Sequence, residues 1–143
     1  MVVTIDFESP ETLPCLPVLR YLRERMEAEF QLPKFPSYHC RIASDIVKRA
    51  LPNLRSVAGN TAPDFEPRHH DCNSDPDRRL FIDLTLDQYG SYPTIAVVKP
   101  PGIFHPERLL FDTTREEIRS REALNFLETH QDEIEQLRFQ CRI

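Results

Sequence analysis

The sequence predicts an α+β fold, and the order of its patterns carries that prediction. Helical patterns come first, strand patterns fill the middle of the chain, and one long helical pattern closes it. This segregation favours an α+β arrangement with an antiparallel sheet over an alternating arrangement with a parallel sheet. The length of 143 residues suits one domain over residues 1–143, and the sequence contains no repeat, low-complexity tract or linker that would divide it.

Two helices are predicted in the first third of the chain. Residues 9–30 carry an apolar stripe at helical spacing, with Pro17 suited to a first helical turn. A proline-rich segment then interrupts the chain, and residues 40–51 carry a broader apolar stripe with a period of 3.6. We therefore expect the second helix to be well buried and to begin at Cys40.

The remaining elements are short strands followed by a long helix. Residues 78–86 and 94–99 have the strongest strand patterns, and weaker ones lie at residues 2–7, 52–60 and 64–72. The polar run 73–77 predicts a turn and residues 100–107 predict a loop. Residues 111–137 predict a helix, which a capping box of Thr113 and Glu116 would begin.

Composition limits the classes of function. A formal net charge of -5 disfavours a nucleic-acid surface, and no glycine-rich phosphate loop occurs among only 3 glycines. No stretch approaches the roughly 18 apolar residues of a membrane span, and the N-terminus lacks the features of a signal peptide. We expect a chain that binds neither nucleic acid nor membrane and is cytoplasmic, or exported without a cleavable signal peptide. The oligomeric state stays open.

A cysteine, two histidines and an aspartate form a candidate nucleophilic site. Cys40 stands in the first turn of a predicted helix, where unpaired N–H groups and the helix dipole favour a thiolate. A histidine base and a group that orients it would complete the site. His69 or His70 supplies the first, and Asp83 on the next strand supplies the second. Between Ile82 and Leu84, a buried Asp83 would be costly without a partner.

Three blocks of the sequence resemble the transglutaminase-like branch of the papain-like cysteine hydrolase superfamily. They are "CRIAS" at a helix start, "RHHDC", and "FIDLTLDQYG", in which Asp83 and Thr85 match a D-x-T motif. The resemblance covers about residues 37–90. The family's second block reads HxW, whereas this chain has no Trp and places Cys72 two residues after His70. We prefer His70 over His69 for this reason, and the two side chains point to opposite faces of a strand.

The resemblance implies a papain-like core with the nucleophile helix packed on a small antiparallel sheet. It also implies thiol chemistry on a protein or peptide amide, as in a peptidase, a deamidase or a transglutaminase-like acyltransferase, with no cofactor. Cys40 would be the nucleophile, His70 or His69 the base, and Asp83 the orienting carboxylate. Thr85 and Gln88 would add hydrogen bonds near the site, and Tyr38 would line the cleft.

Two other functions compete with this hypothesis. A papain-like domain without activity would bind a protein partner through its long helix. Alternatively, the chain binds zinc through the cluster of His69, His70 and Cys72. Cys40 and Asp71 add further ligand types that suit zinc, although the chain has no CxxC or HExxH motif.

Overall fold

The computed structural model describes residues 4–112 and 121–141. Three α-helices occur in these residues: α1 (Leu16–Glu29), α2 (Cys40–Ala50) and α3 (Arg121–Cys141). Two short 3-10 helices accompany them, η1 (Pro10–Thr12) and η2 (Leu86–Tyr89). The strands are β1 (Phe7–Glu8), β2 (Arg55–Thr61), β3 (His69–Asp75), β4 (Leu80–Asp83), β5 (Ala96–Val98) and β6 (Phe104–Asp112).

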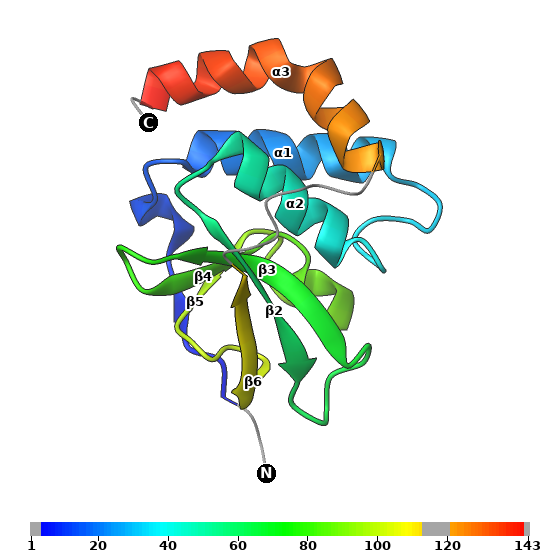
Figure 1. The fold of residues 1–143 in the computed structure, drawn as a ribbon, viewed down its shortest axis with the longest axis vertical. Helices are drawn as coiled ribbons and strands as arrows, with labels where there is room; N and C mark the ends of the chain where they lie inside the picture. Colours follow the sequence, from blue (N-terminus) through cyan, green and yellow to red (C-terminus); the bar gives the residue numbers. More distant parts are fainter. Residues whose placement is uncertain (1–3, 113–120, 142–143) are drawn as a thin grey trace.

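The strands form one antiparallel sheet in the order β1-β5-β4-β3-β2-β6. Figure 1 shows the three α-helices together on one side of this sheet, with α2 next to β3. The predicted α+β class, with helices packed on an antiparallel sheet, is therefore confirmed. None of the helices in the described residues is long and apolar enough to cross a membrane.

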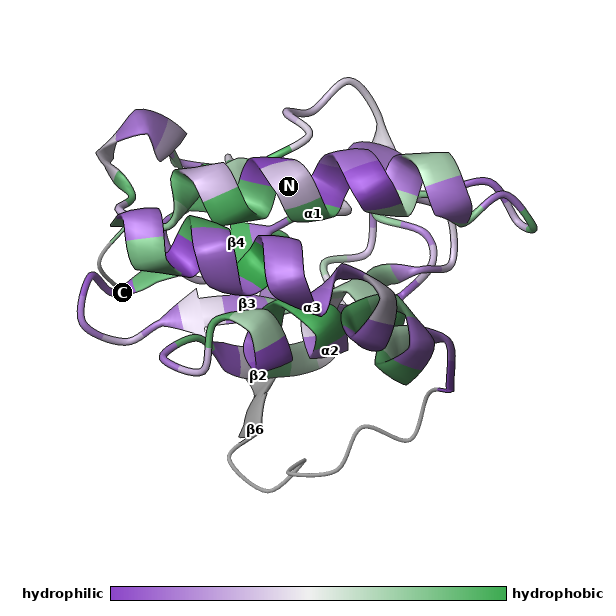
Figure 2. Ribbon diagram, turned by 90° about the horizontal axis from the view of Figure 1, so that it is seen from above, coloured by the Kyte–Doolittle hydropathy of each residue, from purple (hydrophilic) through white to green (hydrophobic). Residues whose placement is uncertain are grey.

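Each face of the sheet contributes to its own apolar core. On the helix side, Ile82 and Leu84 of the β4 segment pack with buried residues of the helices. On the other side, Phe81 packs with the buried ring of Phe104. Successive strand residues point to opposite faces, so Asp83 falls on the Phe81 side. Figure 2, which views the molecule from above, shows many hydrophilic residues along α1 and α3.

Several predicted element boundaries were wrong, because hydrogen bonding between strands outweighs the preference of the local sequence. Residues 104–112, expected as loop and helix start, pair with β2 as strand β6. The polar residues 73–75, expected as a turn, belong to β3. Asn73 donates to the Ser44 carbonyl of α2, and Asp75 accepts backbone N–H groups of the turn that follows. The Thr113–Glu116 capping pattern lies outside the described residues.

A buried arginine ties α1 to the segment that follows β4. Arg23 is 4% exposed, and its guanidinium donates to both carboxylate oxygens of Asp87, each at 2.7 Å. It also donates to Glu27 of the same helix and to the Leu84 carbonyl at 2.6 Å, and it lies over the Phe35 ring. Because a buried guanidinium needs all of these acceptors, it fixes the path of the chain on both sides of Thr85.

We predict that Asp87→Asn lowers the free energy of unfolding by about 2 kcal/mol, because it leaves a buried charge with a weaker set of partners. Glu11→Gln is the matched control. It removes the pair between Glu11 and Arg20, whose side chains are 68% and 54% exposed, and should cost less than about 0.5 kcal/mol. Chemical denaturation of both variants measures the difference. Equal losses would mean that Asp87 does not anchor the fold.

Candidate active site

Helix α2 begins at Cys40, as the sequence predicts, and no side chain caps its first turn. His39 is the N-cap residue, but its ring nitrogen Nδ1 lies 2.8 Å from the Ser37 carbonyl rather than on the helix. Tyr38 takes a positive φ of 63°, which turns the chain into the helix. The N–H groups of the first turn therefore lack a side-chain cap beside the half-buried Cys40 thiol.

His70 and Asp83 form a buried pair. His70 is 0% exposed, and its Nε2 lies 2.6 Å from Oδ2 of Asp83. The other carboxylate oxygen, Oδ1, accepts the backbone N–H of Thr85 at 2.9 Å and the Thr85 hydroxyl at 3.2 Å. Both oxygens of Asp83 thus have partners, which fixes the ring of His70 in one orientation.

The short helix η2 completes the surroundings of the His70 ring. The ring of Tyr89 packs edge-on against it with 5.2 Å between the ring centroids, and the centroid of the Phe104 ring lies 5.6 Å away. Nε2 of Gln88 lies 3.3 Å from the ring nitrogen Nδ1, the atom that Asp83 leaves free. Gly90 ends η2 with a φ of 147°, a backbone conformation that a residue with a side chain rarely adopts.

The surroundings of His70 favour its protonated form. Burial lowers the pKa of His70, but the charge of Asp83 and the hydrogen bond to it oppose burial, and interaction with Cys40 adds to their effect. The net result raises the pKa of His70 from 6.5 to about 10. The imidazole therefore carries a proton at neutral pH, between a carboxylate on one side and the Cys40 thiol on the other.

The pairing of β3 with β4 ends before the position where Cys40 interacts with His70. Residues 70 and 71 of β3 point to opposite faces, and Asp71 is on the helix side. The β3–β4 ladder covers only Asn73–Asp75 on β3, and beyond Asp83 the chain turns away into η2. His70 pairs with Gly59 of β2 but lies past the part of β3 that pairs with β4, and Cys40 interacts there with His70 and with Asp71.

Sequence reasoning considered Asp71 only as a zinc ligand and missed its contact with the Cys40 thiol. The side chain of Asp71 is 1% exposed, and its Oδ2 accepts the Cys40 thiol at 3.8 Å. The same oxygen lies 3.2 Å from Nε2 of His69, whose side chain is 59% exposed. The period of a strand contained a signal, because residues 69 and 71 share a face and therefore bring a carboxylate toward the helix that carries Cys40.

The other predicted residues divide into two groups. Thr85 donates to Asp83, and Nε2 of Gln88 lies 3.3 Å from Nδ1 of His70. Tyr38 is 76% exposed and, within the described part of the chain, has no hydrogen bond to Cys40, His70 or Asp83. It lines a cavity of about 380 Å³ together with His39 and Ile42, beside the start of α2. Tyr38 therefore borders the approach to the helix rather than the histidine.

The cluster proposed for zinc does not assemble. His70 and Cys72 share one face of β3, whereas His69 lies on the other face and contacts Asp71. Among residues 4–112 and 121–141, no three histidine, cysteine or acidic side chains are placed to hold a metal ion.

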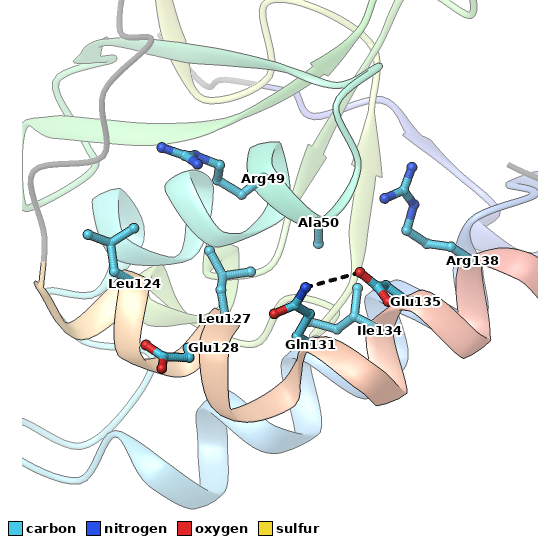
Figure 3. Close-up of a pocket in the computed structure, with 9 residues that line it drawn as sticks. All are labelled: Arg49, Ala50, Leu124, Leu127, Glu128, Gln131, Ile134, Glu135 and Arg138. Carbon is cyan, nitrogen blue, oxygen red and sulfur yellow. Dashed lines mark hydrogen bonds between the residues drawn. The ribbon is translucent and has the colours of Figure 1, made fainter.

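A larger cavity of about 520 Å³ lies between α2 and α3, at the far end of α2 from the thiol (Figure 3). Its lining combines apolar, acidic and basic side chains: Arg49, Ala50, Leu124, Leu127, Glu128, Gln131, Ile134, Glu135 and Arg138. Arg49 follows Cys40 by nine positions along the helix, a rise of about 14 Å. This cavity is therefore separate from the candidate active site.

The other cysteines lie in different surroundings. Cys15 and Cys72 are buried, and burial raises the pKa of both thiols, well above 9.0 for Cys72. Cys141 is half-buried near the end of α3. Comparisons with known protein families, with curated proteins and with solved structures found no match.

We predict that the His70–Asp83 pair makes stability depend on pH. The pKa of His70 is about 10 in the folded chain and 6.5 as an ordinary histidine, so its contribution is complete below pH 6.5. It should be lost progressively between pH 6.5 and 10, by about 1 kcal/mol per pH unit at most.

Denaturation of the wild type and of His70→Gln across this pH range measures the effect. The stability difference between the two proteins should shrink as the pH rises. His69→Gln is the control, because it replaces the exposed neighbour and should keep the slope of the wild type. A His70→Gln variant with the wild-type slope would contradict the prediction.

Proposed function

We propose that this chain is a thiol-dependent amide hydrolase or acyltransferase with a papain-like core. In this proposal Cys40 is the nucleophile, His70 the acid and base, and Asp83 the carboxylate that orients His70. The observation that carries it is the buried hydrogen bond of 2.6 Å between His70 Nε2 and Asp83 Oδ2, beside a thiol at a helix N-terminus. Such a pair fixes the histidine tautomer and stabilises the imidazolium form.

The charges suit attack by a thiolate. A protonated imidazole and the first N–H groups of a helix both favour the anionic form of a neighbouring thiol. The Cys40 sulfur would attack the carbonyl carbon of an amide, forming a C–S bond and an oxyanion. The uncapped backbone N–H of Cys40 is available as a donor to that oxyanion.

His70 would then act first as an acid and afterwards as a base. Its Nδ1 proton passes to the leaving nitrogen as the C–N bond breaks, which leaves a thioester on Cys40 and a neutral imidazole. Water or an amine next attacks the thioester and gives a proton to His70 while the C–S bond breaks. The thiolate and the imidazolium are restored, and no external oxidant or reductant is needed.

An inactive papain-like domain that binds a partner is the second candidate, and the cavity between α2 and α3 favours it. Leu124, Leu127 and Ile134 give this cavity an apolar wall (Figure 3). Leu124 is 43% exposed there, as expected of a surface that another chain could cover. The two candidates differ in the reactivity of Cys40.

We predict that Cys40 reacts with iodoacetamide at least about tenfold faster than Cys141 at pH 6.5, because only Cys40 has a protonated imidazole and a helix N-terminus beside it. The buried Cys15 and Cys72 should react more slowly than both. Mass spectrometry of timed samples gives the four rates from one protein. Equal rates at Cys40 and Cys141 would favour the inactive domain.

We predict that Asp83→Asn slows this reaction of Cys40 on the order of tenfold or more. An amide at residue 83 donates a hydrogen to Nε2, so the neutral histidine carries its proton on Nδ1 and cannot take one from the thiol. Asp75→Asn is the matched control. It removes a buried carboxylate that pairs with Arg78, at the other end of β3. An equal effect of both substitutions would argue against a triad.

A further inference from the structure

The Cys40 thiol lies between two histidine–carboxylate pairs rather than beside one. On one side is the buried pair of His70 and Asp83. On the other side, Asp71 accepts the thiol at 3.8 Å and contacts His69 at 3.2 Å through the same oxygen, Oδ2. The mechanism proposed above uses only the first pair and gives no role to Asp71 and His69.

A buried carboxylate beside a nucleophilic thiol works against its activation. The carboxylate stabilises the S–H form by accepting its hydrogen, and its negative charge opposes a thiolate at the same place. In a buried setting this effect is large, because little water screens the two charges. The carboxylate of Asp71 is 1% exposed, so we expect it to lower the reactivity of the Cys40 thiol.

His69 is placed to change this effect. Its side chain is 59% exposed and therefore open to solvent, while its Nε2 lies 3.2 Å from the buried carboxylate. A positive charge on residue 69 would draw the negative charge of Asp71 toward itself. The Asp71 oxygen would then be a weaker acceptor for the thiol, and the thiolate would form more readily.

We propose that Asp71 is an electrostatic brake on the Cys40 thiol and that a positive charge at position 69 releases it. This inference rests on the proposed function of Cys40 as nucleophile. It makes the reactivity of the thiol depend on two opposing neighbours: His70, which promotes the thiolate, and Asp71, which restrains it. His69 connects the restraint to the surface of the protein.

The other titratable groups that face this thiol do not take over the role. Tyr89 comes from η2, and burial together with the charges of Cys40 and Asp83 raises the pKa of its phenol. Cys72 comes from β3, and burial raises the pKa of its thiol in the same way. Both groups stay protonated and neutral near pH 7. Asp83 acts on Cys40 through the protonated His70.

The test uses three single and two double variants and the iodoacetamide rate of Cys40 at pH 6.5, with Cys141 as the internal standard. Asp71→Asn should raise the rate on the order of tenfold, which corresponds to one unit of pH in thiol ionisation. His69→Lys, a permanent cation, should react faster than the neutral His69→Gln by a similar factor. When Asp71→Asn is added to each, the Lys-to-Gln ratio should fall toward one.

Each result decides the matter. A slower or unchanged rate in folded Asp71→Asn, with circular dichroism as the check, would overturn the brake. So would equal rates for His69→Lys and His69→Gln, which leave the buried carboxylate in place and do not depend on the stability of Asp71→Asn. An undiminished Lys-to-Gln ratio in the Asp71→Asn background would show that residue 69 acts by another route, and this too would overturn it.

His70→Gln separates failure of this inference from failure of the proposed function. If this substitution slows Cys40 but Asp71→Asn has no effect, only the brake is lost. If Cys40 reacts at the rate of Cys141 whatever stands at positions 70 and 71, both proposals fall.

Discussion

One buried carboxylate, that of Asp83, constrains the site and the chain around it. An isolated carboxylate in this position would cost several kcal/mol, so each of its oxygens must find donors. Oδ2 faces the His70 ring, and Oδ1 accepts two hydrogen bonds from Thr85. These partners come from β3 and from the segment that follows β4. Satisfying Asp83 therefore ends strand β4, turns the chain at Thr85 and orients the histidine in one step.

A second buried charge holds the same segment from the helix side. Arg23 of α1 bonds the carbonyl of Leu84 and the carboxylate of Asp87, which flank the turn at Thr85. The helix η2 contains Asp87, and it presents Gln88 and Tyr89 to the ring of His70. The position of the histidine thus depends on α1, although no residue of α1 belongs to the proposed triad. In this way the charges that stabilise the fold also shape the site.

The sequence predicts a contact in the site where the chemistry of a single residue requires a partner. Asp83 between two apolar neighbours requires a partner, and the structure supplies His70. The alternation of side chains along a strand places His69 and His70 on opposite faces of the sheet, but it does not say which face Asp83 shares. That depends on where the β3–β4 ladder stops, and the stop is set by the bonds of Thr85 and Arg23. The contact of Asp71 with Cys40 and the existence of strand β6 escaped prediction for a similar reason, since both depend on packing between segments far apart in the sequence.

The reactivity of Cys40 is finally a question of charge balance. Around its sulfur the structure places one buried imidazole, protonated at neutral pH, and the buried carboxylate of Asp71. Asp83 is bound to the imidazole, so the positive charge on His70 is partly neutralised from behind. A thiolate at Cys40 would then be the third negative group, after Asp71 and Asp83, around the single positive charge of the buried imidazolium. The helix N-terminus supplies the remaining positive potential, and its lack of a side-chain cap leaves that potential to act on the sulfur. The start of α2 at Cys40 is for this reason as much a part of the site as the histidine.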